Sequence, residues 1–370
     1  MRDVYINGLG AFLPNKPVPN KDIESYIGKI NGQKSRNKAI VLRQNKIKTR
    51  HYALDDKGAP QYSSAQMAAH AVTNALKNSE VSLQNIRYLA ASSTLGDVLV
   101  PGHASNIHGA LKIPPLEIAN FQSVCASSIM ALKSAWLQLG SGEHECAAVT
   151  GSEFASRYFR PGFYEPYLKA SGQKSLPFEA DFLRFTLSDG AGAALLEAKP
   201  NERQLSLKIK WIDIRSYADR FDTCMSAGET DNMYWGNFGN PIEAVQNGAL
   251  FLKQNFKVLN KMIAIWVFHY LDLIDQGKIV TDNIDHLCSH YSSHSLREEA
   301  VTLLDKAGAL IDENKWFSNL YSKGNTGTAS IFIMLEELFY SGTLKSGQNI
   351  LCHVPESGRC VNGLMMLEVI

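Results

Sequence analysis

The chain has 370 residues, of which 45% are hydrophobic and 20% are charged. These proportions are ordinary for a folded globular protein and exclude a disordered chain or a fibrous repeat. The 37 basic and 36 acidic side chains leave a net charge of +1. The charge balance therefore excludes a global attraction to nucleic acid or to an anionic membrane surface.

The cysteines and the apolar runs point to a cytoplasmic protein. The six cysteines show no CxxC spacing and no dense disulfide framework, so a reducing compartment is expected. Residues 1–14 lack the uninterrupted apolar stretch of a signal peptide. The most apolar run, Met262 to Ile274, contains His269 and Asp272 and is shorter than the roughly 20 residues that span a bilayer. This run predicts a buried helix, and no membrane span is expected.

In chain order, short apolar runs alternate with longer segments of helical period. Apolar runs at 4–14 and 86–94 each precede a helix-like segment, at 63–78 and 103–113. Such alternation predicts an α/β sheet covered by helices. A Gly/Ala-rich strand at 186–198 then enters a polar turn that contains Pro200. We therefore expect two halves, residues 1–197 and 198–370.

Two segments, one from each half, resemble each other. Each has a small-residue turn, a Ser-Ile pair and an amphipathic helix closed by glycine, within residues 123–140 and 324–342. The similarity is typical of an internal duplication, although a single pair of segments also arises by chance.

Cys125 stands where an apolar run meets the first small residues of the earlier of these helices. The positive end of a helix dipole favours the nucleophilic thiolate, so the position suits a catalytic thiol. The alternative is a buried structural cysteine, which is the usual fate of an unpaired one.

Two residues of the second half suit a cysteine nucleophile. His290 follows a short apolar strand, and Asn325 lies in a glycine-flanked loop before the second helix. Both side chains can donate hydrogen bonds to a developing thioester oxyanion. The three residues therefore indicate acyl transfer through a thioester on Cys125.

Four motifs, VCASS, SDGAGAALL, the segment at His290 and KGNTGTASI, together resemble the ketoacyl-acyl carrier protein synthase III family over nearly the whole chain. The resemblance implies an α/β thiolase fold, with duplicated βαβαβαββ halves in five α-β-α-β-α layers. It implies that Cys125 accepts the acyl group, while His290 and Asn325 bind the carbonyl of the second thioester. Where the family has a Gly-Gly-Phe-type turn, the backbone N–H groups of Ser357 and Gly358 are the expected oxyanion donors.

The segment from Ser25 to Leu54 departs from the family pattern. Ala39 stands where a tryptophan normally stacks on the adenine of coenzyme A, so substrates carried on the phosphopantetheine of an acyl carrier protein are expected instead. The segment has eight basic residues and no acidic one. An acidic carrier protein could dock there, the alternative being a solvated basic face. The predicted docking residues are Arg36, Lys38, Arg43, Lys46, Lys48 and Arg50.

A second departure narrows the expected reaction. Glu153 stands where the family more often has a shorter aspartate, and residues 29–40 form an insertion. With the PESGR motif at 355–359, these features resemble the ketosynthase–cyclases that make dialkylresorcinols and bacterial stilbenes. Such relatives join a β-ketoacyl thioester to an enoyl or acyl thioester and close a cyclohexanedione ring. Glu153 is the expected base for ring closure; alternatively it pairs with Arg157 or Arg160.

Other functions stay open at this point. They are an ordinary synthase III that makes linear β-ketoacyl thioesters, an acyltransferase to an alcohol or amine, and a non-catalytic partner subunit. His290 and His294 are four residues apart, but no third metal ligand accompanies them, so no metal or other cofactor is expected. The protein is expected to be a homodimer.

Overall fold

A continuous β-sheet runs through the computed structural model, which describes residues 1–230 and 233–370. The ten strands of this sheet follow the order β12-β11-β13-β14-β8-β1-β7-β6-β4-β5. The first-half strands are β1 (Tyr5–Phe12), β4 (Tyr88–Ser93), β5 (Glu117–Gln122), β6 (Cys146–Glu153) and β7 (Gly190–Glu197). The second-half strands are β8 (Leu207–Ser216), β11 (His286–Ser289), β12 (Trp316–Phe317), β13 (Asn349–Glu356) and β14 (Val361–Val369).

The two sets of strands repeat one topology. In the first half, β5, β4 and β6 are parallel, and β7 and β1 add to them in antiparallel fashion. In the second half, β12, β11 and β13 are parallel, and β14 and β8 are antiparallel. The short β1–β8 pairing at Tyr5 and Ile6 joins the two sets. The expected duplicated βαβαβαββ arrangement is therefore present, while the division at residue 197 stays a prediction.

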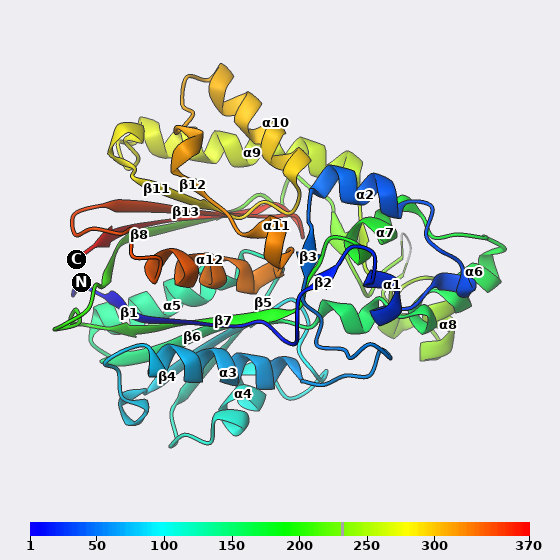
Figure 1. Cartoon of the computed structure of the whole chain (residues 1–370), viewed down its shortest axis with the longest axis horizontal. Coiled ribbons are helices and arrows are strands. Elements are labelled where there is room, and N and C mark those ends of the chain that lie inside the picture. Colours follow the sequence, from blue (N-terminus) through cyan, green and yellow to red (C-terminus); the bar gives the residue numbers. More distant parts are fainter. Residues whose placement is uncertain (231–232) are drawn as a thin grey trace.

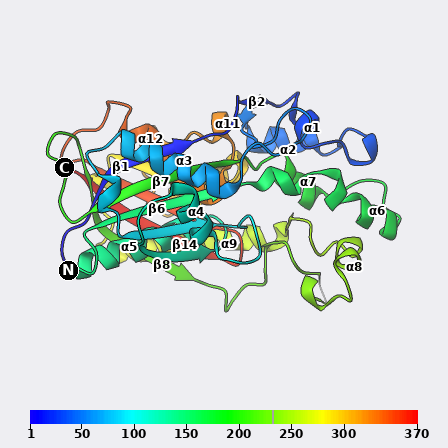
Figure 2. The ribbon, with the colours of Figure 1, turned by 90° about the horizontal axis from the view of Figure 1, so that it is seen from below.

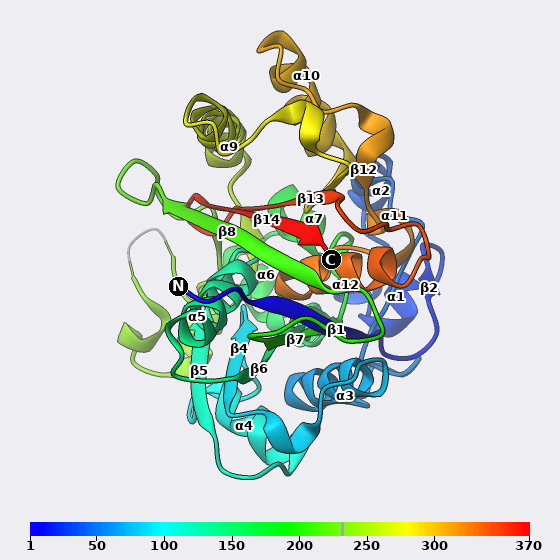
Figure 3. The same ribbon diagram turned by 90° about the vertical axis from the view of Figure 1, so that its left-hand side faces the viewer.

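Helices and sheets alternate in the expected α-β-α-β-α layers (Figure 1). On one outer face lie α9 (Phe256–Asp275) and α10 (His294–Lys306), and on the other lie α3 (Ser64–Lys77) and α4 (His103–Leu111). Between the two sheet halves lie α5 (Ser127–Ser141) and α12 (Ser330–Phe339). The view along the layers in Figure 3 shows the same stacking.

The central helices are buried because their sequences are apolar around most of their circumference. In α12 only the glutamates of LEELF are partly exposed, and Phe332 and Leu335 join one core cluster with Ile129 and Leu132 of α5. Gly192 of β7 allows this close packing, because a Cβ there would lie 2.4 Å from the Cβ of Phe332. The SDGAGAALL strand is thus shaped by helix–sheet packing.

The remaining elements gather at one end of the layers, away from both termini (Figures 1 and 2). They are α1 (Ile23–Tyr26), α2 (Lys38–Asn45), α6 (Glu165–Ser171), α7 (Phe178–Arg184) and α8 (Pro241–Gln246). Short strands complete this part of the molecule: β2 (Val18–Pro19), β3 (Thr49–Arg50), β9 (Met225–Ser226) and β10 (Lys253–Gln254), with α11 (Leu320–Lys323) beside them. These elements cover the end of the sheet at which the predicted site residues lie.

The apolar run at 262–274 lies inside α9, a helix of 20 residues whose inward face is buried. Over the described ranges, no helix is both long and apolar enough to cross a membrane. Each of the six cysteines is buried and free of disulfide bonds. No cluster of three potential metal ligands occurs among the residues that the structure places.

Candidate active site

Cys125 lies in the short turn between β5 and α5, at the start of the central helix. The residue is 4% exposed, and its carbonyl accepts a hydrogen bond from Ser128 Oγ at 2.9 Å. The helix begins here because the first apolar turn of α5 packs between the two sheet halves. The thiol therefore sits at a helix N-terminus in the middle of the molecule, as the sequence predicts.

His290 directly contacts this thiol. It follows the last residue of β11, and its Nε2 lies 3.1 Å from Cys125 Sγ. The backbone N–H of His290 donates to the carbonyl of His353 at 2.8 Å, which continues the pairing of β11 with β13. Burial lowers the pKa of His290 to about 4, so the imidazole is neutral and able to accept a proton. The structure thus joins two residues that are 165 positions apart.

Glu356 is the functional neighbour that sequence reasoning missed. It ends β13, and its carboxylate accepts hydrogen bonds from Ser123 Oγ at 2.6 Å and from the Ala126 N–H at 3.0 Å. It therefore occupies the N-terminus of α5 beside Cys125. No local motif marks this glutamate, because its partners lie in the other half of the chain; only the departure of PESGR from the family's glycine-rich turn singled out the segment.

The sequence predicts that the helix dipole favours the thiolate of Cys125, and the position of Glu356 shows that this prediction is wrong. Burial raises the pKa of Cys125 well above its usual value, and the nearby carboxylates of Glu356 and Glu153 raise it further. The helix dipole does not outweigh these effects, since Glu356 already uses the donor groups at the helix start. The resting site holds a neutral thiol beside a neutral imidazole.

Asn325 reaches the same place from the loop before α12. Its backbone bonds to the segment before β7, with the N–H donating to Thr186 O at 3.2 Å and the carbonyl accepting from Ser188 N at 2.8 Å. The side-chain oxygen accepts from the Gly327 N–H at 2.9 Å. Because the oxygen is used in this way, the amide group is oriented and its NH₂ is the end left to donate.

Glu153 ends β6 and lines one cavity together with Cys125 and Asn325. It accepts hydrogen bonds from the N–H and hydroxyl of Thr94, at 3.1 and 2.7 Å, and from the N–H of Thr328 at 3.3 Å. Burial raises the pKa of this carboxyl to about 7. Near neutral pH, both the protonated and the ionised form of Glu153 are therefore populated.

The alternative arginine pairing of Glu153 is wrong. Arg157 forms an ion pair with Asp97 at 2.9 Å and donates to two carbonyl groups of the loop that begins at Thr94. Arg160 donates to the carbonyl of Arg157 at 3.0 Å. Glu153 is thus held by neutral donors, and the charge of Arg157 lowers its pKa less than the hydrogen bonds from Thr94 and Thr328 do.

The predicted oxyanion residues lie at the same junction. Ser357 directly follows β13 and lines the Cys125 cavity. The carbonyl of Ser357 accepts from Met225 N at 2.9 Å, and that of Gly358 from Cys224 N at 2.8 Å. These bonds fix the turn through its carbonyl groups. An oxyanion role for the N–H groups of Ser357 and Gly358 stays a prediction.

The predicted docking residues divide into two groups. Arg36, Arg43, Lys46 and Lys48 are exposed on or beside α2. Arg50 is fully buried, where it donates to Phe185 O and to Asn20 Oδ1, both at 2.6 Å, so it is wrong as a docking residue.

Lys38 also faces inward rather than outward. Its side chain is 17% exposed and forms an ion pair with Glu24 at 2.9 Å. It is therefore wrong as a freely available docking charge. Ala39 lies in the first turn of α2 and offers no ring for an adenine to stack on.

The site also meets a second cavity. His290, Ser292, Gln254 and Ser357 line an apolar pocket between the second-half sheet and helices α9 and α10. Ser292, Gln254 and Ser357 line the Cys125 cavity as well. Two apolar spaces therefore converge on the Cys125–His290 contact.

Comparison with known proteins agrees with this geometry. The family model of the 3-oxoacyl-[acyl-carrier-protein] synthase III C-terminal region matches residues 274–362. The chain is 22% identical over 366 residues to the β-ketoacyl-[acyl-carrier-protein] synthase III of Clostridium kluyveri, covering 99% of both chains. It is also 22% identical over 353 residues to the corresponding Clostridium perfringens enzyme, covering 95% of both.

Solved structures share the whole fold at lower identity. The tetronic acid condensing enzyme AbyA1 aligns with a TM-score of 0.78 at 20% identity, covering 99% of both chains. Xanthomonas campestris OleA, in a variant with bound lauric acid and lauroyl-CoA, aligns with a TM-score of 0.75 at 18% identity, again covering 99% of both. Fold and comparisons together define a thiolase-fold condensing enzyme. The chain is similar over nearly its whole length to ketoacyl-acyl carrier protein synthase III enzymes, and residues 274–362 match the C-terminal model of that family.

Proposed function

We propose that the protein is a ketosynthase–cyclase that joins two carrier-bound thioesters, one of them a β-ketoacyl thioester, and closes a cyclohexanedione ring. The observation that carries this proposal is Glu153. It is a buried carboxyl with a pKa of about 7, free of an arginine partner, in the cavity of Cys125 and Asn325. Ring closure needs a second carbanion, and such a carboxyl can remove the proton from carbon.

The first step of the proposal is acylation of Cys125. The sulfur attacks the carbonyl carbon of the incoming thioester, and the bond to the phosphopantetheine sulfur breaks. Because the thiol is neutral at rest, its proton must leave as the new bond forms, and Nε2 of His290 is 3.1 Å away. The same proton then passes from His290 to the departing phosphopantetheine sulfur.

Condensation follows when the second thioester enters the site. His290, which is neutral again after acylation, takes a proton from the α-carbon of this thioester. The negative charge spreads to the adjacent carbonyl oxygen, to which the oriented NH₂ group of Asn325 can donate. The carbanion bonds to the carbonyl carbon of the Cys125-bound chain, the bond from that carbon to Cys125 Sγ breaks, and the released thiolate takes the proton that His290 received from the α-carbon.

The partners in this proposal are an acyl carrier protein and a second copy of the chain. Docking of the carrier protein is supported by the exposed basic residues Arg36, Arg43, Lys46 and Lys48 at the end of the molecule that holds the site. A homodimer is supported by β5, an edge strand on which Ile118 is 41% exposed. An open apolar strand edge favours pairing with another chain.

The product distinguishes this proposal from its rival. The parent enzyme and Glu153→Gln are each supplied with a β-ketoacyl and an enoyl thioester of an acyl carrier protein, and products are measured by mass spectrometry. The proposal predicts the cyclic dione from the parent and uncyclised condensation product from the variant. A cyclic product formed by Glu153→Gln at the parental rate would remove Glu153 as the base.

The second candidate is an ordinary synthase III that releases a linear β-ketoacyl thioester. It is supported by the names of the Clostridium relatives, which match over nearly the full length. If the parent enzyme condenses a primer with a malonyl thioester and forms no ring with any substrate pair, this candidate replaces the proposal.

A further inference from the structure

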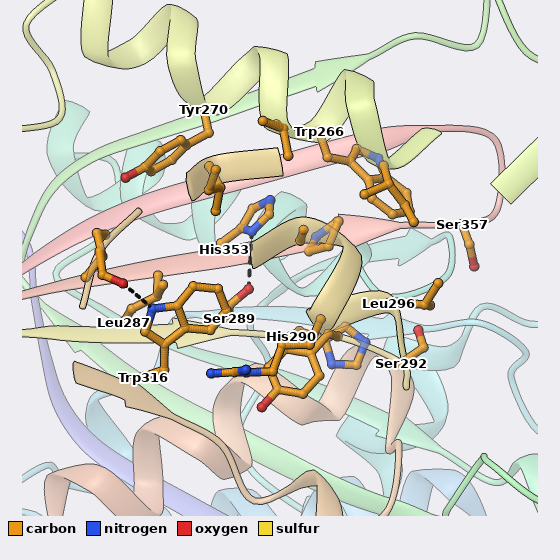
Figure 4. A pocket seen from close by; sticks show the side chains of 18 of the residues that line it. Trp266, Tyr270, Leu287, Ser289, His290, Ser292, Leu296, Trp316, His353 and Ser357 are labelled. Atoms are coloured by element: carbon orange, nitrogen blue, oxygen red, sulfur yellow. Dashed lines mark hydrogen bonds between the residues drawn. The ribbon is translucent and has the colours of Figure 1, made fainter. Parts of the chain in front are cut away.

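The apolar pocket between the second-half sheet and the outer helices, which we call the outer pocket, has one polar centre on its sheet floor, apart from the polar residues toward the active site and Arg297 of α10. Its walls are mostly hydrocarbon and aromatic, with Trp266 and Tyr270 from α9 and Trp316 from β12 around it (Figure 4). Ser289 and His353 lie on the floor of the pocket, on neighbouring strands. Polar groups in such a wall are costly unless they have partners, so their bonding determines what the pocket can bind.

The two floor residues are bonded to each other. Ser289 of β11 and His353 of β13 are register partners in the parallel pairing of these strands. Ser289 Oγ lies 3.3 Å from His353 Nδ1, and Figure 4 shows this contact at the centre of the pocket. The remaining question is which of the two atoms provides the hydrogen.

A chain of buried hydrogen bonds behind His353 answers this question. His353 Nε2 lies 2.8 Å from Asn362 Oδ1, and Asn362 Nδ2 lies 3.3 Å from the carbonyl oxygen of Trp266. A carbonyl oxygen only accepts, so the NH₂ group of Asn362 must face Trp266, and its oxygen must face His353. His353 Nε2 therefore carries the hydrogen.

This series of hydrogen bonds ends at the carboxylate of Asp213. Asn362 Nδ2 also lies 3.1 Å from His269 Nδ1, and His269 Nε2 lies 3.0 Å from Asp213 Oδ1. Lys278 forms an ion pair with Asp213 at 2.9 Å, which keeps this carboxylate ionised and accepting. In every hydrogen bond of this series, the donor therefore lies on the side of the pocket and the acceptor on the side of Asp213.

This direction defines the character of the pocket floor. Burial lowers the pKa of His353 to about 4, so its ring carries one proton, which Asn362 already accepts. His353 Nδ1 is thus an acceptor, and the hydroxyl hydrogen of Ser289 is donated to it. Toward a ligand, Ser289 Oγ therefore acts as a hydrogen-bond acceptor through its lone pairs. A ligand group that donates a hydrogen bond fits this centre, and a group that only accepts does not.

We propose that the outer pocket binds an apolar ligand that carries one hydroxyl group, and that Ser289 accepts a hydrogen bond from that hydroxyl. The pocket reaches the active site through Gln254, Ser292 and Ser357, which it shares with the Cys125 cavity. The inference rests on the proposed function in one respect, that the hydroxylated ligand is a substrate or product of condensation. In that case, either one of the two acyl chains that the enzyme joins or the enolised ring of the product carries a hydroxyl group.

Binding of two matched probes tests this inference without any reaction. Isothermal titration calorimetry of the parent enzyme compares 4-hexylphenol with 4-hexylanisole, in which a methyl ether replaces the hydroxyl donor. We expect the phenol to bind about three- to tenfold more tightly, the range for one neutral hydrogen bond in a buried site. In Ser289→Val, whose methyl groups replace the hydroxyl and cover the acceptor Nδ1 of His353, the preference for the phenol should be lost.

A second variant locates the binding. Ala300 of α10 lines the outer pocket, and Ala300→Trp fills it, so this variant should lose both probes. Equal affinities in the parent, or a preference for phenol that survives in Ser289→Val, would overturn the inference. So would unchanged binding in Ala300→Trp, which would place the probes elsewhere. Because neither probe is a thioester, these outcomes are independent of whether the enzyme condenses or cyclises its substrates.

Discussion

At the scale of single residues, the environment of Cys125 opposes its ionisation. The thiol is buried, and Glu356 places a carboxylate at the helix terminus that would otherwise stabilise a thiolate. A proton acceptor in direct contact is then needed for nucleophilic attack, and His290 is that neighbour. His290 and Asn325 therefore have different roles, because only His290 touches the thiol.

This difference predicts separate effects of two substitutions. His290→Ala should slow both acylation of Cys125 and condensation, whereas Asn325→Ala should leave acylation intact and slow condensation alone, each on the order of 10²–10³-fold. Rapid-quench mass spectrometry measures acyl-enzyme formation separately from product. His294→Ala is the control, since His294 bonds to Tyr321 and Glu298 instead. Normal acylation in His290→Ala would contradict the assigned role in proton transfer.

Glu153 makes stability depend on pH. Its pKa is about 7 in the folded chain against an ordinary 4.5, so between these values the folded state binds more protons than the unfolded state. Stability should therefore fall as the pH rises from about 4.5 to 7 and then level off. Glu153→Gln removes this pH-dependent contribution to stability. The Tm of the variant minus the Tm of the parent should therefore increase between about pH 5 and pH 7.5.

Thermal unfolding at several pH values measures this effect, with the exposed Glu179→Gln as control. If the Tm difference between Glu153→Gln and the parent stays constant over that range, the carboxyl does not hold its proton as described.

The residues also show where sequence reasoning reaches its limit. Cys125, His290 and Asn325 were predicted from their settings and from their order along the chain. Glu356 was not, because a carboxylate becomes part of the site only when β13 ends beside α5. Arg50 was misassigned for the converse reason, since a run of basic residues does not show which side chain turns inward.

At the scale of elements, α2 and the residues that flank it carry the exposed basic charges. Arg43 lies in α2 and Lys46 directly follows the helix, where it approaches Glu298 at 3.7 Å in a solvent-exposed pair. Such a pair contributes little to stability, so charge reversal here should affect docking rather than folding.

Arg43→Glu combined with Lys46→Glu should raise the KM for carrier-bound substrate several-fold at low salt, with little change for small thioester mimics. The effect should shrink as salt is added, because exposed charges are screened. A control of equal charge change is Lys112→Glu with Lys306→Glu, two exposed positions at the C-terminal ends of α4 and α10. An unchanged KM at low ionic strength would show that these basic residues only contact solvent and do not dock the carrier protein.

At the scale of the whole molecule, much of the architecture was predictable. Alternating apolar runs indicated the βα order, and the pair of similar helical segments indicated the duplication that places α5 and α12 together between the sheets. The cavities were not predictable, since the walls of the outer pocket come from α9, α10, β11 and β13. Their shape depends on packing between segments far apart in the chain.

The edge strand β5 predicts association of two molecules. Sedimentation velocity should give twice the mass of one chain, and Ile118→Lys should shift the protein toward single chains by placing a charge on the exposed edge. Val280→Lys serves as control, because Val280 is also an exposed apolar residue, 50% accessible, outside β5. A parent protein that sediments as a single chain would refute the predicted homodimer.

The central claim is that an acyl group is carried on Cys125. Intact-protein mass spectrometry after exposure to a panel of acyl-carrier thioesters, followed by peptide mapping, tests it directly. We expect a mass increase equal to the acyl group, located on the peptide that contains Cys125 and absent from Cys125→Ala. No adduct with any thioester, or an acyl group mapped to one of the other five cysteines, would contradict this claim.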